Sequence, residues 1–403
     1  MSLTSGHLKQ IFLLCLLGIV LGLAACAPRY VQPDFDFSNV TLIPTLVEVP
    51  TPILYTFGLI LSGPYNDQGW NQAHYLAGTY VEAKLPDTKM IYVDLPNLEP
   101  TLAAQKLKEQ GAHLVIFTSN QMAESGLQFA RANSNIYVVI IGGDQAWPSG
   151  YNYAALPNLS NIAGRMEYGQ MIAGCAAALT TQTGIIGYLG LRDEFESRRL
   201  AASAFLGAKY CWQTYRAQDP ASLKFVVTPA GEPAQKASDL YASGSDVLIL
   251  SPDAEQAVMV AQMQAATGNR VWVIPYDSIP ACENAPQTCL GVPYFNWGPA
   301  YVTAVKSAQD GNWQPAFRWN GPDWADINES DTSAIGFFRG QALSPQANRG
   351  LDRFIEELAF GLNLWIGPLN LSDGVSYLPN GQIATDEQVW YFPGLLQGMS
   401  LWP

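Results

Sequence analysis

Polar and aromatic side chains follow several short apolar runs of this sequence, and they are the residues best suited to chemistry. Asn, Asp, Gln and Ser side chains exchange hydrogen bonds, while Trp and Tyr also offer flat faces for stacking. A single loop of this kind would be an ordinary turn, because turns use Gly, Asn, Asp and Pro for backbone reasons. Five such loops in succession predict a ligand-binding site. The candidate ligand-binding residues are Asn66, Asp67, Gln68, Trp70, Ser119, Asn120, Asp253, Tyr276, Asp277, Asn296 and Trp297.

The sequence lacks the motifs of the common catalytic and metal sites. Its three histidines are too few for a multi-histidine metal site, and neither HExxH nor a paired CxxC spacing occurs. A G-x-S-x-G elbow, a P-loop and a G-x-G-x-x-G fingerprint are also missing. Asp67, Asp253 and Asp277 leave two interpretations open: an acid and base pair, or carboxylates that accept hydrogen bonds from a ligand or cap helices. We expect no catalytic residue, metal or cofactor.

Trp70 and Trp297 each have two interpretations, one in the core and one in the site. A tryptophan usually fills core volume. Trp70, however, follows Gly69, and Trp297 follows Asn296, both beside expected strand ends. Stacking on an aromatic face contributes about 1 to 3 kcal/mol per base and tolerates many ring types. Our hypothesis is that the two indoles sandwich a planar heterocycle while the polar candidates bind its edge.

The elements that must position these residues are short apolar runs alternating with helical patterns. Runs of this length are typical of buried parallel strands, and residues 101–110 and 121–132 have the spacing of amphipathic helices. The alternation predicts parallel sheets with helices on both faces, which bind ligands beyond the carboxyl ends of their strands. The expected strands are 54–61, 89–93, 114–117, 136–141, 185–189, 224–227, 247–250 and 271–274.

Length and composition indicate more than one hydrophobic core and argue against binding to nucleic acid. The chain has 403 residues, of which 48% are hydrophobic and 14% charged, so it can bury more than one core and is expected to form two lobes. The net charge of -13 argues against nucleic acid as a partner, because Lys and Arg make most phosphate contacts.

The N-terminus has the pattern of a lipoprotein signal. An apolar run from Ile11 ends in Leu-Ala-Ala before Cys26, and it is shorter than the roughly 20 residues of a membrane-spanning helix. An anchor that is never cleaved is the alternative. We expect residues 1–25 to be a signal peptide and 26–51 a tether, with lipid on Cys26. The protein would then be exported and held at the outer face of the cytoplasmic membrane, in a periplasm or on the cell surface.

Four further cysteines follow this leader, and an exported location permits disulfides. Cys282 and Cys289 flank a polar loop and are candidates for a bridge. Cys175 and Cys211 lie in helical patterns far apart in the sequence, so a bridge and two buried thiols both remain open.

Several segments, taken in order, carry a family resemblance. Residues 63–74 read Gly-Pro-Tyr-Asn-Asp-Gln-Gly-Trp-Asn-Gln-Ala-His, residues 165–174 place an acidic side chain before a Met-Ile-Ala-Gly step, and residues 276–278 read Tyr-Asp-Ser. An Asn-Trp-Gly segment follows within residues 295–301. These segments resemble the basic membrane protein family of ABC-transporter substrate-binding lipoproteins, whose better understood members bind purine nucleosides or nucleobases. The resemblance spans about residues 57–399.

The resemblance implies a two-lobed α/β clamp, the type I periplasmic-binding-protein fold, in which each lobe is a parallel sheet flanked by helices. It further implies a monomer that holds a purine nucleoside or nucleobase in the cleft, with Asp277 on the ligand, and docks on an ABC permease with its ATPase. The segment 192–194, Tyr75 and Asp253 depart from the family pattern, so base and ribose contacts stay open. A sugar-binding lipoprotein of the same fold and an exported nucleoside-processing enzyme are the alternatives.

We expect the lobes to divide the chain discontinuously. The N-terminal lobe would contain residues 52–160 and about 293–315, and the C-terminal lobe residues 161–292 and about 316–372. Residues 373–403 would form a C-terminal segment that packs on the lobes.

Overall fold

The computed structural model describes residues 54–402 except Gln68, residues 95–98 and Asp253. The expected signal peptide, the tether and Cys26 therefore lie outside the described residues, as do the site candidates Gln68 and Asp253. Among the residues described, no helix combines the length and the apolar character needed to cross a bilayer.

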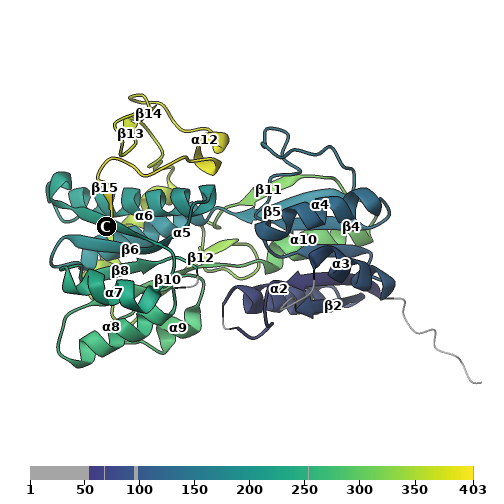
Figure 1. Cartoon of the computed structure of the whole chain (residues 1–403), viewed down its shortest axis with the longest axis horizontal. Coiled ribbons are helices and arrows are strands. Elements are labelled where there is room, and N and C mark those ends of the chain that lie inside the picture. Colours follow the sequence, from purple (N-terminus) through teal and green to yellow (C-terminus); the bar gives the residue numbers. More distant parts are fainter. Residues whose placement is uncertain (1–53, 68, 95–98, 253, 403) are drawn as a thin grey trace, which may run out of the picture. The chain divides into compact units, whose positions relative to one another are not determined.

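The first lobe is built on a six-stranded sheet in which all paired strands are parallel, in the order β11-β5-β4-β3-β1-β2 (Figure 1). Alternate residues of a strand face opposite sides of a sheet, so Leu59 and Leu61 pack in one core and Ile60 in another. Helices α2 (Trp70–Lys84) and α10 (Gly298–Gln309) cover the first core, and α3 (Pro100–Glu109) and α4 (Ala123–Ala132) the second. The strands are β1 (Tyr55–Leu61), β2 (Thr88–Asp94), β3 (Leu114–Phe117), β4 (Tyr137–Ile141), β5 (Leu159–Gly164) and β11 (Phe317–Asn320).

The second lobe repeats this plan with a five-stranded parallel sheet, in the order β15-β7-β6-β8-β9. Ile186 and Tyr188 of β6 face the core beneath α5 and α6, and Leu189 faces the opposite core beneath α7 and α8. The strands are β6 (Ile185–Leu191), β7 (Lys224–Pro229), β8 (Val247–Leu250), β9 (Trp272–Ile274) and β15 (Met399–Leu401). The helices are α5 (Met166–Thr180), α6 (Phe195–Thr214), α7 (Pro233–Ala242), α8 (Gln256–Ala266), α9 (Ile279–Glu283) and α11 (Pro345–Ala359).

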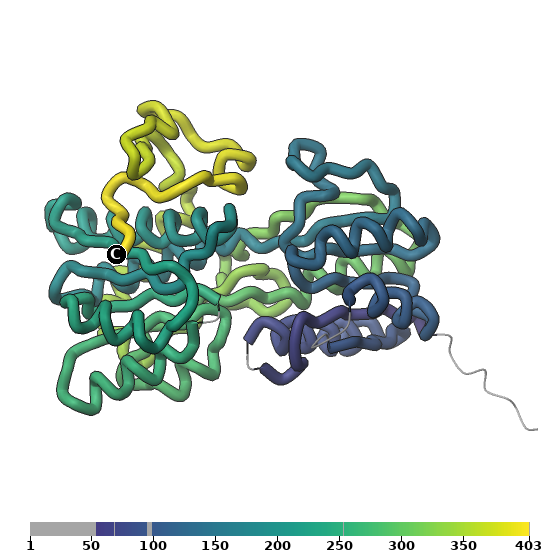
Figure 2. Tube along the Cα trace, in the orientation of Figure 1, coloured from purple at the N-terminus to yellow at the C-terminus, as the bar shows by residue number. Residues whose placement is uncertain are grey.

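The chain passes between the lobes near residue 165, again after β10 (Gly291–Phe295), and a third time after β11 (Figure 2). Strand β10 pairs antiparallel with β12 (Ile335–Arg339) in a small sheet of its own. The expected lobe boundaries differ from these crossings. Strand β5 spans the expected boundary at 160, and β11 pairs with β5 in the first lobe although it lies beyond the expected boundary at 315.

The C-terminal part of the chain packs on the second lobe and also completes its sheet. Strands β13 (Leu369–Asn370) and β14 (Ser376–Leu378) form a short hairpin, and α12 (Asp386–Trp390) follows. Strand β15 then pairs with β7. The sequence predicts only that residues 373–403 pack on the lobes, because the three residues of β15 are too short a run to recognise as a strand.

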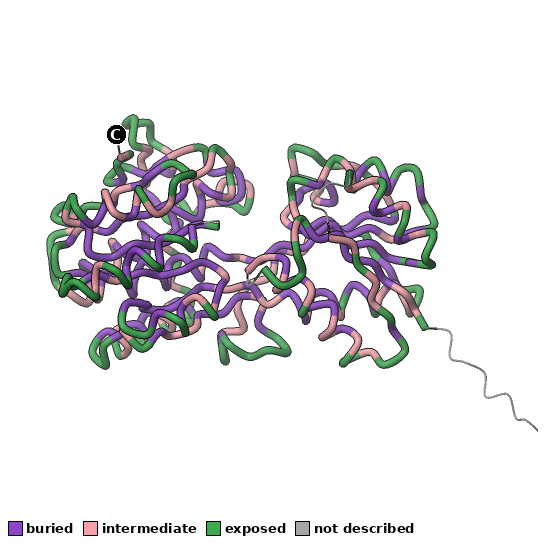
Figure 3. Tube along the Cα trace, turned by 60° about the horizontal axis from the view of Figure 1, so that its bottom comes forward, coloured by how far each residue is buried: buried purple, intermediate pink, exposed green. Residues whose placement is uncertain are grey.

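Buried residues concentrate in the sheets and in the inner faces of the helices, as the purple parts of Figure 3 show. Two disulfides support the second lobe. Cys282 is bonded to Cys289, and Cys175 of α5 to Cys211 of α6, with Cα atoms 5.3 and 5.2 Å apart. The second bond decides the alternative that the sequence left open, because α5 and α6 pack side by side and bring the two thiols together.

Candidate functional site

The carboxyl ends of the strands from both lobes surround a cavity of about 640 Å³, which we call the main cavity. In the first lobe it lies beyond β1 and β3, and in the second beyond β6 and β8. In each sheet these two strands are neighbours, and the chain after one leads to a helix on one face while the chain after the other leads to a helix on the opposite face. Open α/β sheets bind ligands at this position. Seven of the predicted residues line the cavity: Asp67, Trp70, Ser119, Asn120, Tyr276, Asp277 and Trp297.

Two of the predicted residues that the structure describes do not line the main cavity. Asn66 is exposed in the loop after β1. Asn296 lines a neighbouring cavity, and its amide donates hydrogen bonds of 2.8 Å to the carbonyls of Ser330 and Ser333. Asn296 therefore holds a loop in place and stands outside the group of candidates that line the main cavity.

Trp70 is the first residue of α2 and presents a half-buried indole to the main cavity. Its Nε1 donates a 2.8 Å hydrogen bond to the carbonyl of Thr118 at the end of β3. The ring also packs edge-on against His74 and Phe295, at centroid distances of 4.6 and 5.6 Å. These contacts fix the orientation of the indole before any ligand arrives, as a stacking platform requires.

The Trp297 ring packs edge-on against the Trp70 ring and is not parallel to it. The Trp297 ring is only 4% exposed, stacks on Phe295 at 4.5 Å and on His74 at 4.8 Å, and lies at 76° to Trp70. Two rings that sandwich a planar ligand must be nearly parallel. The expected two-indole sandwich is therefore wrong, because the aromatic stack beneath α2 sets the angle of Trp297.

His74 lies within this aromatic support and is fully buried. Burial lowers the pKa of His74 to about 3, so the imidazole is neutral. Its Nδ1 is 2.7 Å from the Tyr301 hydroxyl.

Asp67 folds the loop that carries Trp70. Its Oδ1 accepts from the backbone N–H groups of Gly69 and Gln72, and its Oδ2 from the backbone and side-chain amides of Asn71. Partial burial raises the pKa of Asp67, but these hydrogen bonds outweigh it and hold the pKa below its ordinary value. Of the two interpretations of this carboxylate, the structure supports the capping role.

Asp277 places a buried carboxylate oxygen at the site that no described residue pairs. It follows β9 with a left-handed backbone, φ 54°, and its Oδ1 accepts a 2.8 Å hydrogen bond from the Phe295 N–H. Its Oδ2 is buried without a partner among the described residues. Burial raises the pKa of Asp277 to about 7, the Phe295 hydrogen bond opposes the shift, and the charge of Asp67 adds to it. An unpaired buried oxygen is costly, so a ligand donor would bind here favourably.

Sequence reasoning missed most of the wall contributed by the second lobe. Tyr188 of β6 is fully buried and its hydroxyl has no partner among the described residues. Glu196 lies near the start of α6, where burial raises its pKa, Arg199 opposes the shift and Glu167 adds to it. Both side chains line the main cavity. The one signal in the sequence is the charged segment 192–194 after β6, which departs from the family pattern.

The charged groups that line the main cavity are mostly acidic. Glu194, Glu196 and Glu255 stand on the second lobe with Arg192, and the two aspartates complete the set. An acidic lining favours a ligand that donates hydrogen bonds and disfavours an anion.

Comparison with known proteins agrees with this geometry. Residues 55–327 match the model of the Bmp family, described as ABC transporter substrate-binding protein PnrA-like. The chain belongs to the Bmp family. This match confirms the family expected from the sequence. The Bmp family consists of substrate-binding proteins of ABC transporters, which bind a small molecule.

Comparison with individual proteins gives three further similarities. The chain is 25% identical to a purine-binding protein of Brucella abortus over 82% of this chain and 88% of the relative. It is 23% identical to a putative ABC transporter glucose-binding protein of Haloferax volcanii, over 63% of this chain and 61% of that one. A solute-binding protein of an ABC transporter system from Aeropyrum pernix aligns with a TM-score of 0.59 at 15% identity, covering 76% of this chain and 90% of that chain. This last likeness confirms the two-lobed α/β fold.

Proposed function

We propose that this Bmp protein captures a purine nucleobase or nucleoside in the main cavity and delivers it unaltered to an ABC permease. The observation that carries the proposal is that one cavity holds a fixed indole face, Trp70, and a buried acceptor, Asp277 Oδ2, that no described residue pairs. The purine-binding relative in Brucella abortus supports it.

In this proposal a purine ring stacks on Trp70 while an N–H or O–H of the ligand donates to Asp277. Ser119 and Asn120 stand at the same edge of the first sheet, and Tyr188 and Tyr276 on the opposite wall. Closure of the two lobes removes water and strengthens these hydrogen bonds. A ligand that lacks a matching group leaves buried polar atoms unpaired, which is the source of selectivity.

Calorimetric titration of the protein with a matched panel tests the proposal. We expect adenine or guanosine to bind, and guanosine 5′-monophosphate to bind about tenfold more weakly than guanosine because its phosphate meets the acidic lining. Glucose is the comparison for the sugar-binding alternative. Binding of glucose with no response to any purine would overturn the proposal.

We also propose that the mature protein is exported and anchored to the membrane through lipid on Cys26, as residues 23–26 indicate. Intact-mass spectrometry of the protein from membranes is expected to show a chain that begins at Cys26 and carries acyl groups. A Cys26→Ser variant should lose the acyl mass and leave the membrane fraction. An unlipidated wild-type chain with residues 1–25 still attached would contradict this proposal.

A further inference from the structure

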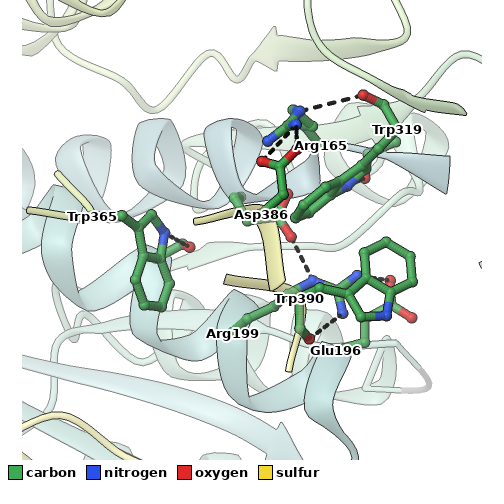
Figure 4. Close-up of polar contacts among 10 residues, drawn as sticks. Arg165, Glu196, Arg199, Trp319, Trp365, Asp386 and Trp390 are labelled. Carbon is green, nitrogen blue, oxygen red and sulfur yellow. Dashed lines mark hydrogen bonds and ion pairs between the residues drawn. The ribbon is translucent and has the colours of Figure 1, made fainter. Parts of the chain in front are cut away.

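The family match ends at residue 327, and the structure describes the chain onward to residue 402. From here on, the C-terminal segment means residues 361–402, which are longer at the N-terminal side than the segment 373–403 expected from the sequence. Two contacts fasten it to the second lobe. Trp365 Nε1 donates to Ser203 of α6 at 3.2 Å (Figure 4), and β15 extends the sheet. A third contact holds it to the crossing between the lobes, where Arg165 donates two 2.9 Å hydrogen bonds to Asp386 (Figure 4).

Arg199 links this segment to the cavity wall. Arg199 is 2% exposed, and its guanidinium forms a 2.5 Å ion pair with Glu167 and lies 4.3 Å from the centre of the Trp390 ring. It also donates to the Trp390 carbonyl at 3.4 Å and stands 3.6 Å from Glu196 (Figure 4). Glu196 lines the main cavity, so the position of α12 is coupled to a ligand-facing carboxylate through one buried side chain.

Tyr391 reaches from the segment to the other lobe. Its hydroxyl donates to Asp144 Oδ2 at 2.5 Å and accepts from the Tyr151 N–H at 2.8 Å. Its ring stacks on the Tyr151 ring at 3.7 Å with an angle of 8°. Asp144 and Tyr151 belong to the loop after β4 of the first lobe, so one side chain joins both lobes by two hydrogen bonds and a ring contact.

An aromatic contact continues this junction. Trp147, from the same loop of the first lobe, stacks on Phe317 of β11 at 4.6 Å and lies parallel to Tyr391 at 5.9 Å. Trp390 packs edge-on against Phe317 at 5.1 Å. Apolar area between the lobes is therefore buried here together with the polar contacts.

Asp144, the carboxylate at this junction, is already satisfied by the protein. A cavity of about 300 Å³ lies beside it, lined in part by Asp144 and Tyr391. Asp144 is 4% exposed, and both of its carboxylate oxygens already accept hydrogen bonds, from Tyr391, Gln145 and Asn152. The Asp144 carboxylate therefore holds the junction together and is not free to bind a ligand.

We propose that the C-terminal segment is a clasp between the lobes, in which Tyr391 limits how far the lobes open and Arg199 positions Glu196 in the cavity wall. The inference rests on the proposed function only in taking the main cavity as the ligand site. A clasp that restricts the open states lowers the free-energy cost of closing the lobes on the ligand. This effect is preorganisation of the binding site. Tyr391 and Arg199 act as positioning residues, since neither lines the main cavity.

The distance between the lobes tests the clasp without any ligand. Azide-bearing residues introduced at Glu109 of α3 and Met263 of α8, both exposed, take donor and acceptor dyes for single-molecule energy transfer. Tyr391→Phe keeps the ring and removes the shared hydroxyl. Tyr377→Phe is the matched control, because the Tyr377 hydroxyl donates to Gln388 within the segment. We expect a broader, longer distance distribution for Tyr391→Phe and the wild-type distribution for Tyr377→Phe.

Calorimetry with guanosine measures how the clasp affects ligand binding. Loss of the hydroxyl is expected to raise the Kd about fivefold in Tyr391→Phe, with no change in Tyr377→Phe. An unchanged distance distribution in Tyr391→Phe, or an equal broadening in both variants, would overturn the clasp. If guanosine and adenine fail to bind the wild-type protein, the proposed function fails while the distance measurement still decides the clasp.

Discussion

Replacing Trp70 with alanine weakens purine binding by about 1 to 3 kcal/mol, or roughly fivefold to 150-fold in Kd. The reason is the loss of the stacking face that the Thr118 hydrogen bond and the His74 and Phe295 rings hold in the main cavity. Calorimetry with guanosine or adenine measures the change.

A matched control separates stacking from a general loss of packing. Trp402 is half-buried on the second lobe and does not line the main cavity, so Trp402→Ala removes an indole elsewhere. We expect Trp402→Ala to leave the Kd unchanged. Trp70→Phe keeps a ring without the Thr118 hydrogen bond and should fall between wild type and Trp70→Ala. An unchanged Kd in Trp70→Ala would reject the stacking role.

Replacing Asp277 with asparagine is expected to weaken binding and to stabilise the fold at neutral pH. The affinity falls by about 1.5 to 3 kcal/mol, roughly tenfold to 150-fold, because a hydrogen bond to a charged acceptor is lost. The effect on stability follows from the pKa of Asp277, which rises from its ordinary value of 3.8 to about 7 on folding. Between these values the folded protein binds more protons than the unfolded chain, so stability falls as pH rises toward 7.

Asparagine removes this proton linkage. The melting temperature of Asp277→Asn should therefore equal that of wild type near pH 4, exceed it increasingly up to pH 7 and stay above it by a constant amount at higher pH. Asp67→Asn is the contrast, because the pKa of Asp67 is lowered on folding and its loss should destabilise the protein at neutral pH. Equal affinity and equal melting curves for wild type and Asp277→Asn would contradict the free buried carboxylate.

Much of the fold could be predicted because buried parallel strands are continuous apolar runs. The runs 114–117 and 247–250 are strands over those same residues. Strand β5 reads Leu-Ser-Asn-Ile-Ala-Gly and β11 Phe-Arg-Trp-Asn, and neither has such a run. Their burial depends on pairing in the folded sheet, where Ser160 and Asn161 satisfy backbone groups of neighbouring segments. Local sequence does not contain that information, so the lobe boundaries were misplaced.

The site was predictable where a strand end alone positions the side chain. Trp70 and Asp277 follow β1 and β9, and the rule for open sheets places both at the cavity. The orientation of Trp297 depends on a stack with Phe295 and His74, which come from different segments. Tyr188 points from within β6 and is positioned by the second lobe as a whole, so no local pattern marks it.

Native mass spectrometry of the protein as purified, followed by release and identification of the small molecule it holds, tests the central claim most directly. The account predicts one bound purine nucleobase or nucleoside, recovered unaltered and displaced by added guanosine or adenine. A bound sugar, or a nucleoside recovered as free base and ribose, would contradict it.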